Sequence, residues 1–274
     1  MSDVRVACIQ INAGASVDDN LRRADLLIRE AAAGGAIFIC TPEYFSGFER
    51  AGDKALPAHF PWASHPVVAH FSALAQALQC ELLLGSVGVT SPDGRMRNRS
   101  VLLGRDGQCR AYYDKLHLFD VDLGGGNLIQ ESATIEPGEQ AVVAEADAMR
   151  LGMSVCYDLR FPRLYRQLAQ AGAQVLTVPA AFTRRTGEAH WHILLRSRAI
   201  ENSCFVLAAA QCGKVTGGGE NYGHSLIVSP WGDILAEAGT EEGVIVADLD
   251  LSLVERCRQR IPVLVHERSF SGPE

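Results

Sequence analysis

Cys156 is the residue of this chain whose surroundings best suit a nucleophile. An apolar, strand-like segment at 150–155 leads directly into it, and Pro162, six residues later, suits the first turn of a helix. The N-terminus of a helix favours a thiolate over a thiol. A polar cluster, Tyr-Asp-Leu-Arg, follows this cysteine at once and follows none of the other seven. The placement therefore predicts a reactive thiol on a turn between a strand and a helix.

Two charged residues occupy comparable positions elsewhere in the chain. Glu43 follows the apolar segment 36–40, and Lys115 follows the segment 109–113. A charged side chain at the end of a buried strand is costly unless it is paired or functional. In α/β sheets the strand ends are also where active sites form. Each residue alone suggests a structural ion pair, but together with a thiol they suggest a catalytic site.

These three side chains could hydrolyse an amide. Glu43 would take the thiol proton as general base, and Cys156 would attack the carbonyl carbon to form a thioester. Lys115 and the backbone N–H of Tyr157 would hold the oxyanion, and the lysine would lower the pKa of the thiol. Protonated Glu43 would then give its proton to the leaving amine and activate the hydrolytic water.

The segments around these residues alternate between strand and helix patterns, with hairpins interspersed. Such a pattern predicts a layered α/β protein, and one domain is the simplest interpretation. Ser16 and Asp19 resemble the start of a helix that ends at Gly34. The principal predicted helices are 16–33, 67–79, 162–171, 188–202 and 251–260. Segments 123–132 and 215–223 are predicted to be Gly-rich and irregular, and the glycine run 217–219 lacks the residues of a phosphate loop.

Composition excludes several classes of function. The 274 residues carry 25 Lys and Arg against 32 Asp and Glu, so the net charge of −7 does not favour nucleic acid as a partner. No apolar run approaches a membrane span, and the N-terminus lacks a signal-peptide pattern, so we expect a cytoplasmic protein. The cysteines lack a CxxC spacing and are expected to be reduced.

Metal and histidine chemistry are not expected either. The sequence contains no HxxxH or HExxH pattern, so no metal site is predicted. Because Glu43 supplies the base, His117, His190, His192 and His224 are expected to have structural roles.

In the order Glu43, Lys115, Cys156, the three segments resemble the triad of the nitrilase (carbon–nitrogen hydrolase) superfamily. The resemblance covers essentially the whole chain and implies a four-layer αββα sandwich, without a cofactor, in a single domain at 1–274. In this domain the core would cover about 4–250, and a C-terminal helix and extended tail about 251–274. It also implies a second pocket glutamate, which corresponds to Glu131.

The resemblance further implies a homodimer or higher homo-oligomer. Helices 162–171 and 188–202 are the candidate interface elements in this interpretation.

Further segments resemble the Nit branch of that superfamily. They are 155–162, 186–191, 198–202, 222–225 and 230–233. The resemblance implies deaminated glutathione as substrate, hydrolysed to 2-oxoglutarate and cysteinylglycine. The alternatives left open are an omega-amidase acting on 2-oxoglutaramate, a carbamoylase, and a catalytically silent binding protein of the same fold.

A small anionic amide substrate would need cations in the pocket. Guanidinium groups match carboxylates in a bidentate manner, which makes Arg184, Arg185 and Arg160 the candidate substrate-binding residues. An alternative role for Arg160 is to fix the loop beneath the nucleophile by pairing with Asp158.

Overall fold

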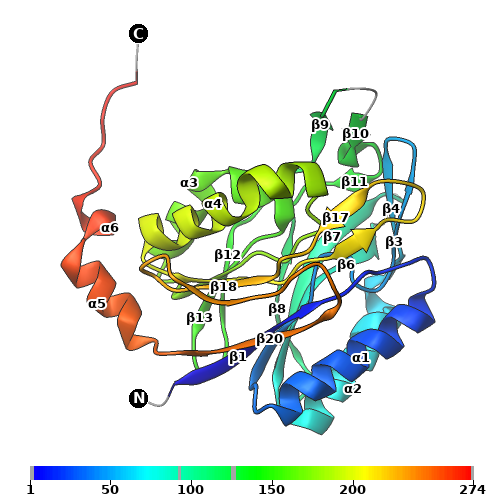
Figure 1. Cartoon of the computed structure of the whole chain (residues 1–274), viewed down its shortest axis with the longest axis horizontal. Helices are drawn as coiled ribbons and strands as arrows, with labels where there is room; N and C mark the ends of the chain where they lie inside the picture. The colour runs from blue at the N-terminus through cyan, green and yellow to red at the C-terminus, as the bar shows by residue number, and fades with distance from the viewer. Residues whose placement is uncertain (1–2, 92–93, 125–127, 273–274) are drawn as a thin grey trace.

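Two β-sheets packed face to face form the centre of the molecule, and a pair of helices covers the outer face of each sheet (Figure 1). The computed structural model describes residues 3–91, 94–124 and 128–272. The order of layers is helix, sheet, sheet, helix, which is the predicted αββα sandwich.

The first sheet contains the N-terminal half of the chain and one late strand. Its central strand β2 is parallel to β1 on one side and to β6 on the other. Strand β20 closes the edge by pairing antiparallel with β1, in the register Val4 to Leu249. The strands of this sheet are β1 (Val4–Gln10), β2 (Phe38–Cys40), β5 (His59–Pro61), β6 (Glu81–Thr90), β7 (Met96–Leu103), β8 (Cys109–Asp114), β11 (Ile135–Glu136) and β20 (Gly243–Leu249).

The second sheet contains the C-terminal half. Strands β13, β14 and β15 run parallel, and the remaining strands extend the sheet in antiparallel fashion on both sides. In spatial order the strands are β12 (Val142–Glu145), β13 (Arg150–Met153), β14 (Val175–Thr177), β15 (Phe205–Ala208), β18 (Leu226–Val228) and β19 (Ile234–Glu237).

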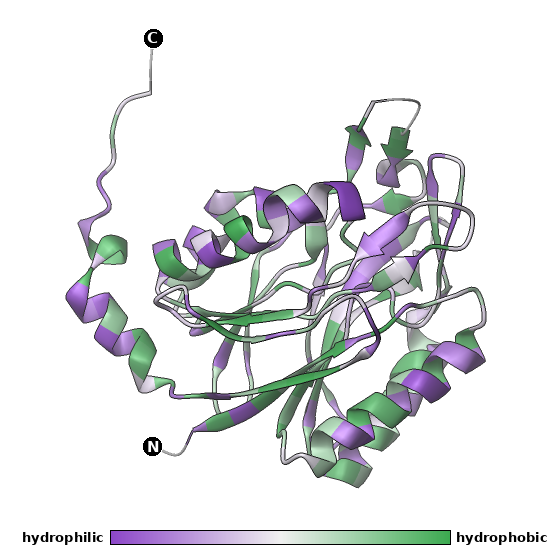
Figure 2. Cartoon of the chain, in the orientation of Figure 1, coloured by the Kyte–Doolittle hydropathy of each residue, from purple (hydrophilic) through white to green (hydrophobic). Residues whose placement is uncertain are grey.

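Both faces of the central strands are buried, which explains their continuous apolar sequences. In β1, Val6 and Cys8 belong to the cluster between the sheets, whereas Ala7 and Ile9 face the helices. Figure 2 shows these strands as predominantly hydrophobic and the helices as mixed. The site therefore rests on strands that are packed from both sides.

Helices α1 and α2 cover the first sheet, and α3 and α4 cover the second (Figure 1). As predicted, α1 starts after Ser16, whose side chain accepts a hydrogen bond from the Asp19 N–H, and ends at Gly34. Within the described residues, no helix combines the length and the apolar character needed to cross a membrane. The helices are α1 (Val17–Ala33), α2 (Pro66–Leu78), α3 (Pro162–Gln170), α4 (Arg184–Asn202), α5 (Ser252–Arg260) and α6 (Val263–His266).

Several elements differ from the sequence-based expectation. Helix α4 begins four residues earlier than predicted, because Gly187, a poor helix former, interrupts the pattern without ending the helix. The C-terminal tail, expected to be extended, contains the short helix α6. The segment 215–223 is not simply a loop, since 217–219 form the turn of a hairpin between β16 (Cys212–Lys214) and β17 (Glu220–Tyr222).

Two other hairpins near the candidate active site were also not predicted. The first joins β3 (Phe48–Ala51) to β4 (Lys54–Pro57). The second pairs β9 (Asp120–Asp122) with β10 (Leu128–Gln130) inside the segment expected to be irregular, of which 125–127 lie outside the described residues. These strands have three or four residues each, which is too short for an alternation pattern to be recognised.

The buried thiols predict a loss of stability at alkaline pH. Burial raises the pKa of Cys204 from 9.0 to about 11, so above pH 9 the unfolded chain releases a proton that the native chain retains. The free energy of unfolding should therefore fall by roughly 2 kcal/mol between pH 9 and 11 from this group alone. Urea unfolding at several pH values measures the effect. Cys204→Ala should weaken the pH dependence, and a flat profile in the wild type would contradict the prediction.

Candidate active site

The structure brings Glu43, Lys115 and Cys156 together at one end of the two sheets. Glu43 follows β2, Lys115 follows β8 directly, and Cys156 follows β13. Strands β2 and β8 belong to the first sheet and β13 to the second. The site therefore lies where the ends of the two sheets meet, and each sheet supplies part of it.

A buried ion-pair network links the lysine to two carboxylates. The Lys115 Nζ donates to Glu43 Oε1 at 2.9 Å and to both oxygens of Glu131, at 3.0 and 2.8 Å. Burial alone would lower the pKa of the Lys115 ammonium, but the adjacent Glu131 and Glu43 carboxylates outweigh it and raise that pKa well above its usual value. All three residues are at most 4 % exposed. Glu131 thus lies where the resemblance placed the second pocket glutamate, at the start of the 3₁₀ turn Glu131–Ala133.

Two further groups hold Glu43 and were not identified from the sequence. The Asn98 Nδ2 donates to Glu43 Oε1 at 2.8 Å, and the backbone N–H of Ala181 donates to Glu43 Oε2 at 2.8 Å. Asn98 stands between two arginines in β7, which gives no sign that its side chain is buried. The backbone of Ala181 could not have been recognised because any residue supplies an N–H.

The nucleophile lies on a strained turn. Cys156 has a φ of 49°, a conformation that residues with a side chain rarely adopt and that often marks a functional site. Its own N–H donates to the carbonyl of Pro179 at 2.9 Å. No acceptor among the described residues takes the N–H of Tyr157, which leaves that group available for an oxyanion.

The electrostatics of the thiol differ from the sequence-based expectation. Cys156 starts a short 3₁₀ helix, Cys156–Arg160, and α3 follows only at Pro162, so the thiol is not at the end of an α-helix. Burial, followed by the negative charge of Glu43, raises the pKa of Cys156 well above its usual value, although Lys115 acts in the opposite direction. The lowering expected from Lys115 is therefore present, but burial and Glu43 outweigh it, so activation of the thiol depends on its neighbouring carboxylate.

Asp158 connects the nucleophile turn to the segment that carries the lysine. Its Oδ2 accepts from the Tyr113 hydroxyl at 2.7 Å and from the Val155 N–H at 2.8 Å. Its Oδ1 lies 2.7 Å from Nδ1 of His117 and 3.1 Å from that residue's backbone nitrogen. Tyr113 and His117 flank the lysine in sequence, so this fully buried carboxylate fixes Lys115 relative to the thiol.

Arg160 does not pair with Asp158, so that alternative is wrong, because the aspartate is already saturated by other donors. Instead Arg160 Nη1 lies 3.2 Å from His190 Nδ1, and the guanidinium lies 5.2 Å from the ring centroid of Phe182. Phe182 directly follows the residue whose N–H binds the catalytic glutamate. Within the described part of the chain no carboxylate forms an ion pair with Arg160.

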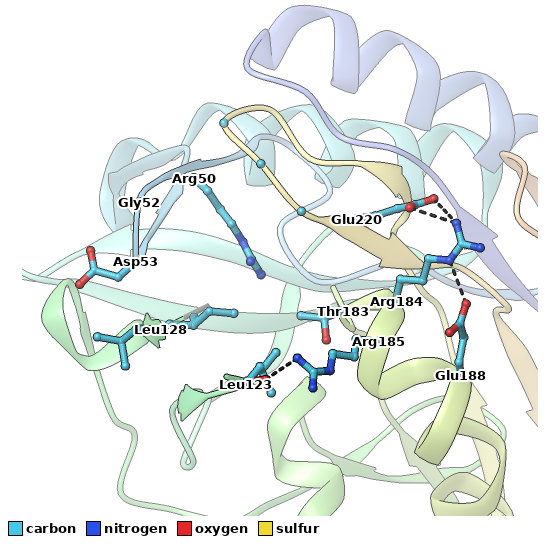
Figure 3. A pocket seen from close by; sticks show the side chains of 14 residues that line it. Arg50, Gly52, Asp53, Leu123, Leu128, Thr183, Arg184, Arg185, Glu188 and Glu220 are labelled. Atoms are coloured by element: carbon cyan, nitrogen blue, oxygen red, sulfur yellow. Dashed lines mark hydrogen bonds and ion pairs between the residues drawn. The ribbon is translucent and has the colours of Figure 1, made fainter. Parts of the chain in front are cut away.

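A pocket of about 630 Å³ lies between the β3–β4 hairpin, the β16–β17 turn and the start of α4 (Figure 3). Glu43, Lys115 and Cys156 do not line it, but the lining residues Ile129 and Thr183 are each two positions from Glu131 and Ala181, which contact the triad. Arg184 and Arg185 line it as expected, but both are engaged. Arg184 pairs with Glu188 at 2.9 Å and with Glu220 at 3.0 Å. Arg185 donates to the carbonyl of Leu123. Figure 3 shows a third arginine in this pocket, Arg50, which the sequence analysis did not select.

The remaining histidines lie outside the triad. His192 Nε2 lies 2.8 Å and His224 Nδ1 3.2 Å from the same oxygen of Glu237. These three ligand atoms lie within 4.8 Å of one another, an arrangement that sequence spacing could not reveal because the residues come from α4, a loop and β19. These hydrogen bonds with Glu237 explain the positions of the imidazole rings of His192 and His224 as structural.

Comparison with known proteins identifies the class. The chain belongs to the carbon–nitrogen hydrolase family, which matches residues 5–259. It is therefore a carbon–nitrogen hydrolase of the nitrilase fold, as the resemblance of the three segments implied.

Individual relatives divide between two activities. The chain is 37 % identical over 269 residues to omega-amidase NIT2 of Homo sapiens, covering 98 % of this chain and 96 % of the relative. It is 38 % identical over 270 residues to a deaminated glutathione amidase of Synechocystis sp. (strain PCC 6803 / GT-S), covering 97 % and 98 %.

A solved structure similar to the chain carries a modified nucleophile. It is a mutant of the amidase from Nesterenkonia sp. AN1, in which the acetamide moiety of fluoroacetamide is covalently added to the active-site cysteine. The two are 27 % identical with a TM-score of 0.77, over 97 % of this chain and 94 % of that one.

Proposed function

We propose that this carbon–nitrogen hydrolase is a cysteine-dependent amidase that cleaves deaminated glutathione into 2-oxoglutarate and cysteinylglycine. The observation that carries the amidase assignment is the convergence of a thiol, a carboxylate and an ammonium in one buried site. The names of the relatives support an amide as the substrate class. They support deaminated glutathione and 2-oxoglutaramate equally, so the choice between these two rests on the pocket.

Acylation starts from the neutral thiol. Glu43 removes the proton as Cys156 attacks the amide carbon, so the high pKa of the free thiol does not require a standing thiolate. The negative charge that develops on the carbonyl oxygen is stabilised by the Lys115 ammonium and the Tyr157 N–H. The ammonium has three N–H bonds, and in the structure they are directed to Glu43 and to the two oxygens of Glu131. Once Glu43 is protonated, the N–H now given to it can turn to the carbonyl oxygen while Glu131 holds the lysine in place.

The protonated Glu43 then completes the cycle. It gives its proton to the leaving nitrogen, the C–N bond breaks, and an S-acyl thioester with Cys156 remains. After cysteinylglycine departs, the carboxylate of Glu43 takes a proton from water, and the hydroxide attacks the thioester through a second oxyanion held by the same donors. Cleavage of the C–S bond releases 2-oxoglutarate and returns the proton to the thiol.

Substrate charge favours the larger diacid. Deaminated glutathione carries two carboxylates, and the pocket offers guanidinium groups that the protein itself does not neutralise. Of the three arginines selected from the sequence, Arg160 and Arg185 form no ion pair with a carboxylate among the described residues. Arg160 in addition lies on the same 3₁₀ turn as Cys156. We assign it to the carboxylate beside the ketone. Arg184 and Arg185 line the outer pocket and would need to exchange their present partners to bind substrate.

A parallel assay of two substrates tests the proposal. We expect 2-oxoglutarate release from deaminated glutathione with a higher kcat/KM than from 2-oxoglutaramate, and no release in Cys156→Ala. Preference for 2-oxoglutaramate would make the chain an omega-amidase with the same mechanism. Release of ammonia from a carbamoylated amine instead would favour a carbamoylase. Inactivity on all substrates together with an unreactive thiol would favour a binding protein of this fold.

We also propose that the chain forms a homodimer through the face of α4. Apolar side chains are exposed there and on the neighbouring turn: Ile193 is 68 %, Ile200 52 % and Trp231 50 % exposed. Monomers rarely leave such a group of apolar side chains in water. Sedimentation velocity should show a dimer that Ile193→Asp and Ile200→Asp convert to monomer. A wild-type monomer at micromolar concentration would contradict the proposal.

A further inference from the structure

Arg50 lines the pocket, and its guanidinium contacts the ring of Phe48, 6.0 Å from the ring centroid, but no carboxylate of the described residues. It lies on the hairpin of β3 and β4, and its Nε is buried without a hydrogen-bond partner. Its guanidinium forms no ion pair with any carboxylate of the described chain. Leaving such a donor buried and unsatisfied is costly, so an arginine of this kind indicates that an external group completes its hydrogen bonds.

The glycine run 217–219, which had no assigned role, shapes the space around Arg50. Residue 217 approaches the backbone so closely that a Cβ there would lie 1.8 Å from the carbonyl oxygen of Arg50. A Cβ on Gly219 would lie 3.3 Å from Arg50 Nη1. The N–H of Arg50 also donates to the carbonyl of Thr216 at 2.8 Å, which joins the two hairpins. The glycines therefore let the β16–β17 turn pass over the arginine without covering the guanidinium.

The side chain is directed into the pocket. Figure 3 shows Arg50 extending into the space between Leu128 and Thr183, whereas the Asp53 carboxylate at the same end points away from it. Thr183 lies two residues after Ala181, whose N–H binds the catalytic glutamate. Burial lowers the pKa of Arg50. The negative charges of Glu43 and of the Cys156 thiolate act to raise this pKa, which means that the guanidinium lies close enough to interact electrostatically with both groups.

We propose that Arg50 binds the carboxylate of the leaving group, which in deaminated glutathione is the terminal carboxylate of the glycine. This inference rests on the proposed function and specifies how the pocket recognises its substrate. The acyl part must lie against Cys156, and the amine part would extend into the pocket. Among the described lining residues, Arg50 is the arginine whose guanidinium forms neither an ion pair nor a hydrogen bond with the protein. The substrate 2-oxoglutaramate has no carboxylate on its leaving group, so Arg50 is a determinant of specificity for the larger amide.

Three substrates and two variants test this assignment. The substrates are deaminated glutathione, the same compound with a C-terminal carboxamide, and 2-oxoglutaramate. The variants are Arg50→Met and, as a matched control on the same hairpin, Lys54→Met, which removes one exposed charge that does not line the pocket. The measured quantity is kcat/KM for 2-oxoglutarate release.

We expect the wild type to prefer the free acid over the carboxamide by about 10–100-fold, the usual effect of one charged hydrogen-bonded contact. Arg50→Met should lose this preference through a higher KM for the free acid. It should keep the wild-type kcat/KM for 2-oxoglutaramate, which also shows that the variant is folded. Lys54→Met should behave as the wild type.

Three other results would overturn the inference. Equal losses of Arg50→Met on all three substrates would place Arg50 at the shared oxo-acid end or in a structural role. Wild-type values on all three would show that Arg50 does not contact the substrate. A wild type that cleaves 2-oxoglutaramate but not deaminated glutathione would refute the proposed substrate, and the inference with it, without affecting the catalytic triad.

Discussion

Replacing Glu43 by Gln is expected to lower kcat for amide hydrolysis by about 10²–10⁴-fold, the usual contribution of a general base. The effect should be at the upper end because burial raises the pKa of Cys156, so little thiolate exists without a base. Gln keeps the size of the side chain and can still accept a hydrogen bond from Asn98 or Ala181. Steady-state assays and the rate of iodoacetamide alkylation at neutral pH measure the loss, and both rates should fall together.

A neighbouring glutamate provides the matched control for that prediction. Glu49 lies on β3, outside the ion-pair network and outside the residues that line the pocket. Glu49→Gln removes the same charge from the same part of the sequence and should keep wild-type kcat. If Glu43→Gln retained kcat within about threefold of the wild type, another group would have to act as the base.

Lys115→Met is expected to impair both catalysis and stability. Without the ammonium, Glu43 and Glu131 become two buried carboxylates without a counter-ion, and breaking such a pair typically costs about 3–5 kcal/mol. The loss of an oxyanion donor should in addition lower kcat by about 10²–10³-fold. Urea unfolding gives the change in the free energy of unfolding, and the assay on folded protein gives the change in kcat.

The double variant Lys115→Met, Glu131→Gln separates these two effects. Removing one of the two carboxylates should recover part of the lost stability, because less uncompensated charge remains buried, but it should not recover kcat. A single Lys115→Met variant as stable as the wild type would show that the network contributes nothing to folding.

The grouping of Glu43, Lys115 and Cys156 was predictable because these residues are conspicuous in the sequence, whereas their catalytic roles stay a proposal. Glu43 follows the apolar strand β2, and Lys115 directly follows β8, so both are charges at the end of a strand, where a charge needs a reason. The two-sheet architecture was inferred from the resemblance and is confirmed, whereas the alternation of elements alone gave only a layered α/β protein. The helix starting after Ser16 was predictable from its cap.

The supporting parts of the site were not predictable, for physical reasons. Asn98 and Ala181 donate hydrogen bonds to Glu43 only because the two sheets pack against each other and bring these residues to it. The pKa of Cys156 was expected to fall because the lysine was visible in the sequence, whereas the desolvation that outweighs it depends on burial. Arg50 was missed because its hairpin strands are four residues long and give no periodic signal.

The pairing of β20 with β1 joins two segments that are made far apart in time during synthesis. The N-terminal strand lacks its edge partner until residue 249 of 274 has been made. The groups that hold Glu43 also arrive late, because Ala181 and the Gln211 side chain, which donates to the Glu43 carbonyl at 2.9 Å, follow the nucleophile in the chain. A chain interrupted before these segments would therefore contain Cys156 but lack the donors that hold Glu43, so synthesis of the nucleophile alone does not complete the site.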